Sequence, residues 1–172
     1  MFVGGVVCAA MSEGRPFSWK ATAVFGGIIN AAINAPIGWA MVKEGQMLGT
    51  WSAPGIALDL AITAFAIAFA TGFIATPQTR KQVKQGKLIA PKLSTYWRTG
   101  FQTWPTSVLH RSINLGILAE ILFLPLPLLV LWIFGIDEAG RMAVTCLKGS
   151  FAFVVGALVT PVVVIAATVD RR

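Results

Sequence analysis

Four long apolar runs constrain the fold of this chain more than any other feature. They cover residues 19–42, 53–76, 113–134 and 142–168. As a helix rising 1.5 Å per residue, each run can cross a hydrocarbon core about 30 Å thick. Only 12% of the residues are charged, about half the share in soluble domains, so a water-facing surface could not be covered. The sequence predicts an all-α polytopic integral membrane protein with four transmembrane helices in one membrane domain.

A ten-residue pattern, A-F-x2-G-x3-T-P, occurs at residues 68–77 and again at residues 152–161, 84 positions later. The pair Ile29-Asn30 recurs at the same offset as Ile113-Asn114. We interpret these matches as a tandem duplication of a helical hairpin. Because each hairpin contains two spans, the two copies have the same orientation, which makes the repeat a parallel one.

The two copies differ after the proline. Charge follows Pro77 within three residues, whereas eight apolar residues follow Pro161. We therefore expect Pro77 to end a helix and Pro161 to kink one, with further kinks at Pro36 and Pro125, since proline removes a backbone hydrogen bond.

The loop 77–112 is the one long polar stretch, and it holds basic residues and no acidic one. The basic residues are Arg80, Lys81, Lys84, Lys87, Lys92, Arg98 and Arg111. The positive-inside bias places this loop and both termini in the cytoplasm, and the short loops 43–52 and 135–141 outside. We expect the aromatic residues Tyr96, Trp97, Phe101 and Trp104 to mark a segment lying along the headgroups. Basic and aromatic residues also interleave in nucleic-acid-binding surfaces, but membrane-flanking charge already explains them, so no nucleic-acid partner is predicted.

Small residues recur at helical spacing along three of the spans. They are Gly27 and Gly38 in the first span, Ala68, Gly72 and Thr76 in the second, and Ala152, Gly156 and Thr160 in the fourth. Small side chains on one face let helix backbones approach closely in lipid. We expect these faces to be helix-packing surfaces, within the chain or between chains.

Ionisable residues inside the spans are few. Asp59 and Lys148 both lie in the outer half of the membrane, and we predict that they face each other as a structural pair. The alternative is that Lys148 extends to the outer headgroups while Asp59 sits at the water boundary.

Glu120 lies within the third span, at a depth close to that of Asn34, with Asn30 and Asn114 nearer the cytoplasm. A carboxyl group near amides can carry protons or bind a cation. The alternative is a protonated carboxyl that hydrogen-bonds to a neighbouring span or subunit.

The sequence contains no catalytic motif. Phosphate-binding loops, nucleophile elbows and paired catalytic carboxylates are absent, and His110 is interpreted as an interfacial residue. Cys8 and Cys146 have no ligand at metal spacing, so neither a metal nor a cofactor is predicted. The start of the chain lacks the basic region of a secretory signal. The stretch M-S-E-G-R from Met11 looks like an ordinary cytosolic beginning, which suggests the hypothesis that translation starts at Met11 and not at Met1.

The first run, I-N-A-A-I-N-A-P-I-G-W, resembles the opening helix of small bacterial multi-pass membrane proteins. The resemblance covers one helix and implies no activity. We expect a multi-pass protein of the bacterial inner membrane that acts as a non-enzymatic accessory or oligomerising subunit. Its expected partners are the lipid bilayer and either further copies of itself or other membrane proteins. The alternative function is a small transporter or channel that uses Glu120 and the asparagines.

Overall fold

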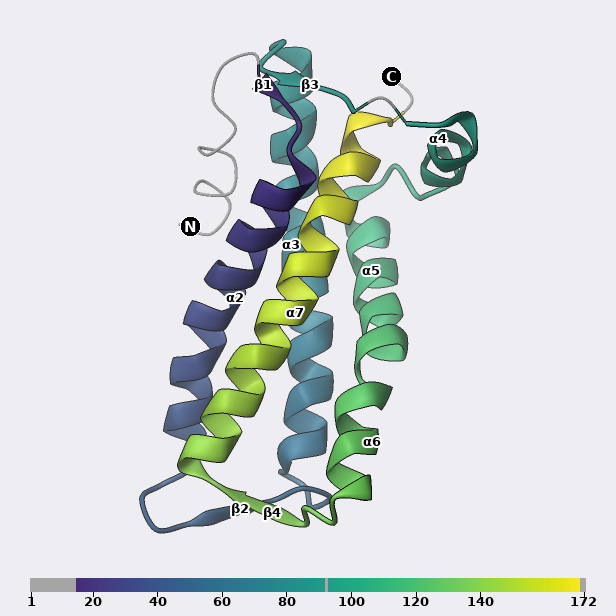
Figure 1. The fold of residues 1–172 in the computed structure, drawn as a ribbon. Helices are drawn as coiled ribbons and strands as arrows, with labels where there is room; N and C mark the ends of the chain where they lie inside the picture. Colours follow the sequence, from purple (N-terminus) through teal and green to yellow (C-terminus); the bar gives the residue numbers. More distant parts are fainter. Residues whose placement is uncertain (1–14, 92, 171–172) are drawn as a thin grey trace.

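The protein is mainly helical in a computed structural model that describes residues 15–91 and 93–170 (Figure 1). Four helical spans are long and apolar enough to cross a membrane, as predicted. They are α2 (Trp19–Met41), α3 (Ile56–Lys84), the consecutive helices α5 (Val108–Phe123) and α6 (Pro125–Ile133), and α7 (Arg141–Thr168). The expectations for Cys8 and for a start at Met1 or Met11 lie outside the described residues.

The prolines act differently from one helix to the next. Pro36 and Pro161 lie inside continuous helices. Pro77 also lies inside a helix, because α3 continues to Lys84, and the expectation that Pro77 ends a helix is wrong. The residues after Pro77 are mostly good helix formers, which outweigh one missing hydrogen bond. The third span is interrupted at Leu124, and Pro125 takes the first position of α6, where its missing N–H costs nothing.

The helices of each expected hairpin do not pack on one another. Instead α2 packs along α7, while α3 packs along both α5 and α7, and α2 scarcely touches α3. Figure 1 shows α7 crossing in front of α3, with α2 on one side and α5 on the other. A short connection places two spans antiparallel, but it does not decide which helix faces fit together.

Two short strand pairs join segments that the sequence presents as loops. At one end, β2 (Met47–Gly49) pairs antiparallel with β4 (Glu138–Gly140). At the other end, β1 (Arg15–Pro16) pairs parallel with β3 (Leu88–Ile89). Thr50 follows β2, is fully buried, and donates its hydroxyl to the Ile136 carbonyl at 2.6 Å. The connection between α2 and α3 is therefore tied to the connection between α6 and α7.

Helix α4 (Thr95–Gln102) lies beside the bundle at the end that carries β1 and β3 (Figure 1). Trp97, Phe101 and Trp104 form a run of neighbouring rings, with centroid distances of 6.4 Å and 5.7 Å. Trp97 is 60% exposed. A short helix with an exposed tryptophan, set beside one end of a bundle, fits the headgroup region of a bilayer.

Candidate functional site

Two clusters of oppositely charged residues join the helical spans. In the first, the Lys148 ammonium of α7 contacts the Asp59 carboxylate of α3, so the predicted pairing is present. Lys148 is almost completely buried, and Asp59 keeps 15% of its side chain exposed. Gly38 of α2 makes room, since a Cβ there would lie 3.3 Å from the Lys148 Cδ. The cluster joins three helices at the end that carries β2 and β4.

The second cluster lies at the opposite end and was not predicted from the sequence. Arg111 of α5 is fully buried and binds Asp170, which follows α7, through two guanidinium nitrogens. Arg80 of α3 donates to the same carboxylate at 2.7 Å. Arg111 also donates to the Pro105 carbonyl at 3.0 Å, and Arg80 donates to the Thr106 carbonyl at 2.6 Å. Asp170 therefore connects α3, α5 and α7.

A signal for this second cluster is present in the sequence. Arg111 was interpreted as one of several cytoplasmic loop charges, but it is followed directly by the third apolar run. Asp170 ends the fourth run, while the loop 77–112 contains no acidic residue that could neutralise Arg111. When a charged residue at the end of one span has no counter-ion nearby in the sequence, a residue of opposite charge at the end of another span is the best candidate for its ion-pair partner.

The small residues fit helices of the same chain together. A Cβ added to Gly156 of α7 would lie 2.6 Å from the Gly26 carbonyl oxygen of α2. A Cβ added to Gly72 of α3 would lie 2.9 Å from the Ser112 hydroxyl of α5. Gly26, which was not predicted, is as tightly packed as the predicted Gly27. The glycine faces are therefore occupied inside the monomer.

The remaining predicted packing residues lie on the same internal surfaces. Ala68 and Ala152 have no exposed surface. Thr160 donates its hydroxyl to the Gly156 carbonyl at 2.6 Å, whereas the buried Thr76 hydroxyl has no hydrogen-bond partner within the described residues. The two copies of the ten-residue pattern therefore differ in whether the threonine hydroxyl forms a hydrogen bond within the described residues.

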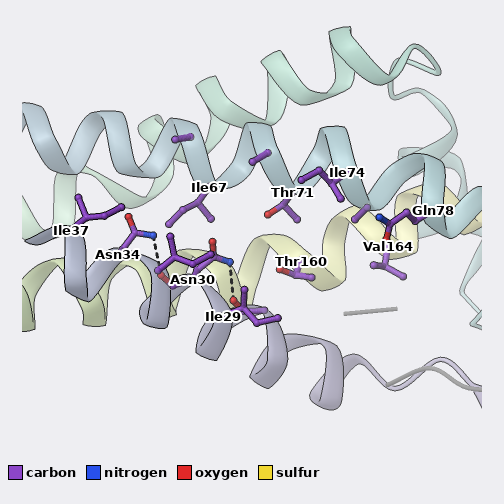
Figure 2. Close-up of a pocket in the computed structure, with 15 residues that line it drawn as sticks. Ile29, Asn30, Asn34, Ile37, Ile67, Thr71, Ile74, Gln78, Thr160 and Val164 are labelled. Carbon is purple, nitrogen blue, oxygen red and sulfur yellow. Dashed lines mark hydrogen bonds between the residues drawn. The ribbon is translucent and has the colours of Figure 1, made fainter. Parts of the chain in front are cut away.

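The other predicted polar residues are divided between two places. Asn30 and Asn34 of α2 line a cleft against α3 (Figure 2), whereas Asn114 and Glu120 lie on α5. Helices α2 and α5 make no substantial contact. The asparagines of α2 and the carboxyl of Glu120 therefore do not line one common path within this chain.

The outward side of α5 and α6 is apolar apart from His110, near the start of α5, and two polar side chains deeper in the span. Asn114 is exposed and Glu120 is partly exposed, and neither side chain has a hydrogen-bond partner within residues 15–91 and 93–170. Large apolar side chains surround them, each at least 41% exposed: Ile117, Leu118, Ile121, Leu122 and Leu126. The opposite side of α5, with Ser112 and Leu115, packs on α3.

The cleft between α2 and α3 has a volume of about 270 Å³. Its walls come from residues 26–37 of α2 and 66–78 of α3, and Thr160 and Val164 of α7 form its floor. The cleft has no charged side chain in its lining. Comparisons with protein-family models, with curated proteins and with solved structures find no match, so function is argued from this geometry.

Proposed function

We propose that this chain is a non-enzymatic subunit of a membrane complex, which associates sideways through the outward side of α5 and α6. The observation that carries the proposal is the position of Glu120. It lies at the middle of the 26-residue span Val108–Ile133, partly exposed and without a hydrogen-bond partner in the described residues. A carboxyl group facing hydrocarbon at that depth is costly unless another polar group meets it.

The simplest partner is a second copy of the same chain. Two Glu120 carboxyl groups facing each other across a two-fold axis can share one proton and hydrogen-bond together, because two adjacent carboxylates do not both stay ionised. Asn114, about 1.7 turns closer to the α4 end and about 120° around the helix, can add a second polar contact at the edge of the same outward side. The expected use of the small-residue faces for association is not part of the proposal, since those faces are filled by helices of this chain.

The test uses two differently tagged copies expressed together, solubilised in a mild detergent and purified through one tag. We expect wild-type copies to co-purify. Glu120→Leu should abolish co-purification, since leucine suits lipid and offers no hydrogen bond, whereas Glu120→Gln should retain most of it because an amide both donates and accepts. Glu44→Leu, at an exposed acidic residue of the connection between α2 and α3, is the matched control.

The same variants separate assembly from transport. If Glu120 carried protons, liposome-reconstituted protein would show a proton flux that Glu120→Gln abolishes, because an amide does not titrate. Co-purification of Glu120→Leu at the wild-type level would overturn the assembly proposal.

We also propose that both termini face the cytoplasm of a bacterium, with the protein in its inner membrane. The support is the positive charge at one end of the bundle, where Arg80, Lys81, Lys84 and Lys87 extend α3 and its connection. A reporter fused after Asp170 that is active only outside the cytoplasm should stay inactive.

The proposed duplication of a two-helix unit draws support from the packing. Gly72 and Gly156 occupy the same position of the ten-residue pattern, and each packs on the first helix of the other unit. Related helices then meet in a similar way twice, with α2 on α7 and α5 on α3.

A further inference from the structure

The cleft between α2 and α3 opens sideways and is walled by residues of unequal size. On α3 three of the seven lining residues are alanines, including Ala66 and Ala70, whereas α2 supplies Ile33 and Ile37. Both isoleucines are more than 40% exposed. The alanines keep α3 from filling the space beside α2, so an apolar chain can enter from the bilayer without crossing water.

Asn30 and Asn34 place two hydrogen-bond acceptors in this apolar cleft. Asn30 Nδ2 donates to the Gly26 carbonyl at 2.8 Å, and Asn34 Nδ2 donates to the Asn30 carbonyl at 2.9 Å. Figure 2 shows both amide oxygens turned away from these bonds, on the side facing α3. Asn34 is only 9% exposed, so its free oxygen is available to little besides an occupant of the cleft.

A third polar group lies on the α3 wall of the cleft. Thr71 of α3 lines the cleft, its hydroxyl points into the same space in Figure 2, and the described residues offer that hydroxyl no hydrogen-bond partner. At 1.5 Å per residue, Asn30 lies at the middle of α2, about 16 Å from either end, and Asn34 lies about 10 Å from the Met41 end. Water does not satisfy polar groups at such a depth in hydrocarbon. The amide oxygens of Asn30 and Asn34 can therefore accept a hydrogen bond from a membrane-soluble molecule that carries a donor.

We propose that the cleft binds a neutral lipid alcohol, whose hydroxyl donates its one proton to the Asn34 amide oxygen while an oxygen of the same molecule accepts from Thr71. A charged headgroup is disfavoured because the lining offers no counter-charge. The volume of about 270 Å³ is at the lower limit for ligand pockets, so the cleft takes the hydroxyl end and the adjoining part of a chain, while the rest stays in the bilayer. The proposal is independent of the association through Glu120.

The test is photo-crosslinking of the full chain in lipid nanodiscs with a diacylglycerol that carries a diazirine in one acyl chain. Labelled peptides should come from α2 and α3. The same probe with its hydroxyl acetylated should label them less, by about two- to tenfold, which is the range expected for one hydrogen bond. A phosphatidic acid probe should label them less than the free alcohol does.

Three variants accompany the probe. Asn34→Ala should lower labelling of the cleft about as much as acetylation does. Ala70→Phe fills the cleft from an exposed position of α3 and should abolish labelling. Ser150→Ala, at an exposed position of α7 that does not line the cleft, should leave labelling unchanged. Unfolding temperatures establish whether each variant is folded. If Asn34→Ala does not fold, the labelling of Ala70→Phe tests whether the lipid binds in the cleft.

The proposal fails if the acetylated or phosphatidic acid probe labels α2 and α3 as strongly as the alcohol, or if label spreads evenly onto α5. It also fails if folded Ala70→Phe is labelled like the wild type. Competition with unlabelled diacylglycerol or with a long-chain isoprenoid alcohol then shows which source of hydroxyl binds more tightly.

Discussion

Helix α7 and the span formed by α5 and α6 are almost equally apolar, with mean hydropathies of 2.4 and 2.3 over their most apolar stretches. Yet 61% of that stretch of α7 is buried inside the molecule, against 17% for α5 and α6. Hydropathy therefore selects the segments that enter the membrane, but it does not select the helix that becomes central.

Side-chain size and placed charges account for the difference. On α7, Gly149, Ala152 and Gly156 let other helices approach its backbone. Lys148, toward one end of α7, and Asp170, just beyond the other end, form ion pairs with neighbouring helices. On α5, Gly116 and Ser112 serve one neighbour, and the outward side carries large apolar residues. A central helix needs small residues on more than one side, because lipid gives apolar helices no reason to prefer each other.

The strongest way to break this arrangement is to remove the carboxylate that joins α7 to α5. Asp170→Asn leaves the fully buried Arg111 without its counter-charge, and we expect a loss of about 3–5 kcal/mol in the free energy of unfolding. Denaturant unfolding in detergent, followed by tryptophan fluorescence, measures it. Asp137→Asn, at an exposed carboxylate at the other end, should have almost no effect. Equal losses in the two variants would contradict the role given to Asp170.

A second comparison places the same substitution on the central and on the outer helix. Gly156→Ala puts a methyl group 2.6 Å from a backbone oxygen of α2, which a side-chain movement does not relieve. We expect a loss of about 1–3 kcal/mol. For Gly116→Ala on α5, the three atoms nearest to the added methyl group all belong to the ring of Phe65, a side chain that can move more easily than backbone, so the unfolding free energy should change less. If Gly116→Ala cost more than Gly156→Ala, the packing of α7 would not be what distinguishes the two helices.

The smallest expected effect concerns Lys148 and Asp59. Lys148→Met leaves Asp59 without its partner, but Asp59 keeps 15% exposure and water can reach it, so we expect a loss of about 1–2 kcal/mol. Replacing both residues, with Asp59→Leu and Lys148→Met, should recover most of that loss, because an apolar pair avoids the desolvation of two charges. A double-mutant cycle with unfolding free energies measures the coupling. A double variant as unstable as the sum of the single ones would show that the two side chains act independently.

Features that depend on local sequence were predictable. Span length follows from hydropathy, and the pairing of Asp59 with Lys148 follows from two opposite charges placed at one depth. The expectation that α3 ends at Pro77 was wrong because the helix propensity of the residues after Pro77 outweighs one missing backbone hydrogen bond.

Features that depend on which helices meet were not predictable. A face of glycine, alanine and threonine accepts many partners, so the positions of Gly72 and Gly156 do not reveal that they pack on α5 and α2. The burial of Arg111 and the cleft beside Asn34 arise only after those partners are chosen. The strands β2 and β4 have three residues each, too few to show a two-residue periodicity.

The packing of α2 on α7 has a consequence for biosynthesis. Of the four described spans, α2 is made before the others, whereas α7, which covers Gly26 and Asn30, is made after them. Until then α2 exposes its polar, glycine-lined side to lipid or to the insertion machinery. Nascent chains that stop before Arg141 therefore lack the surface that shields this side of α2.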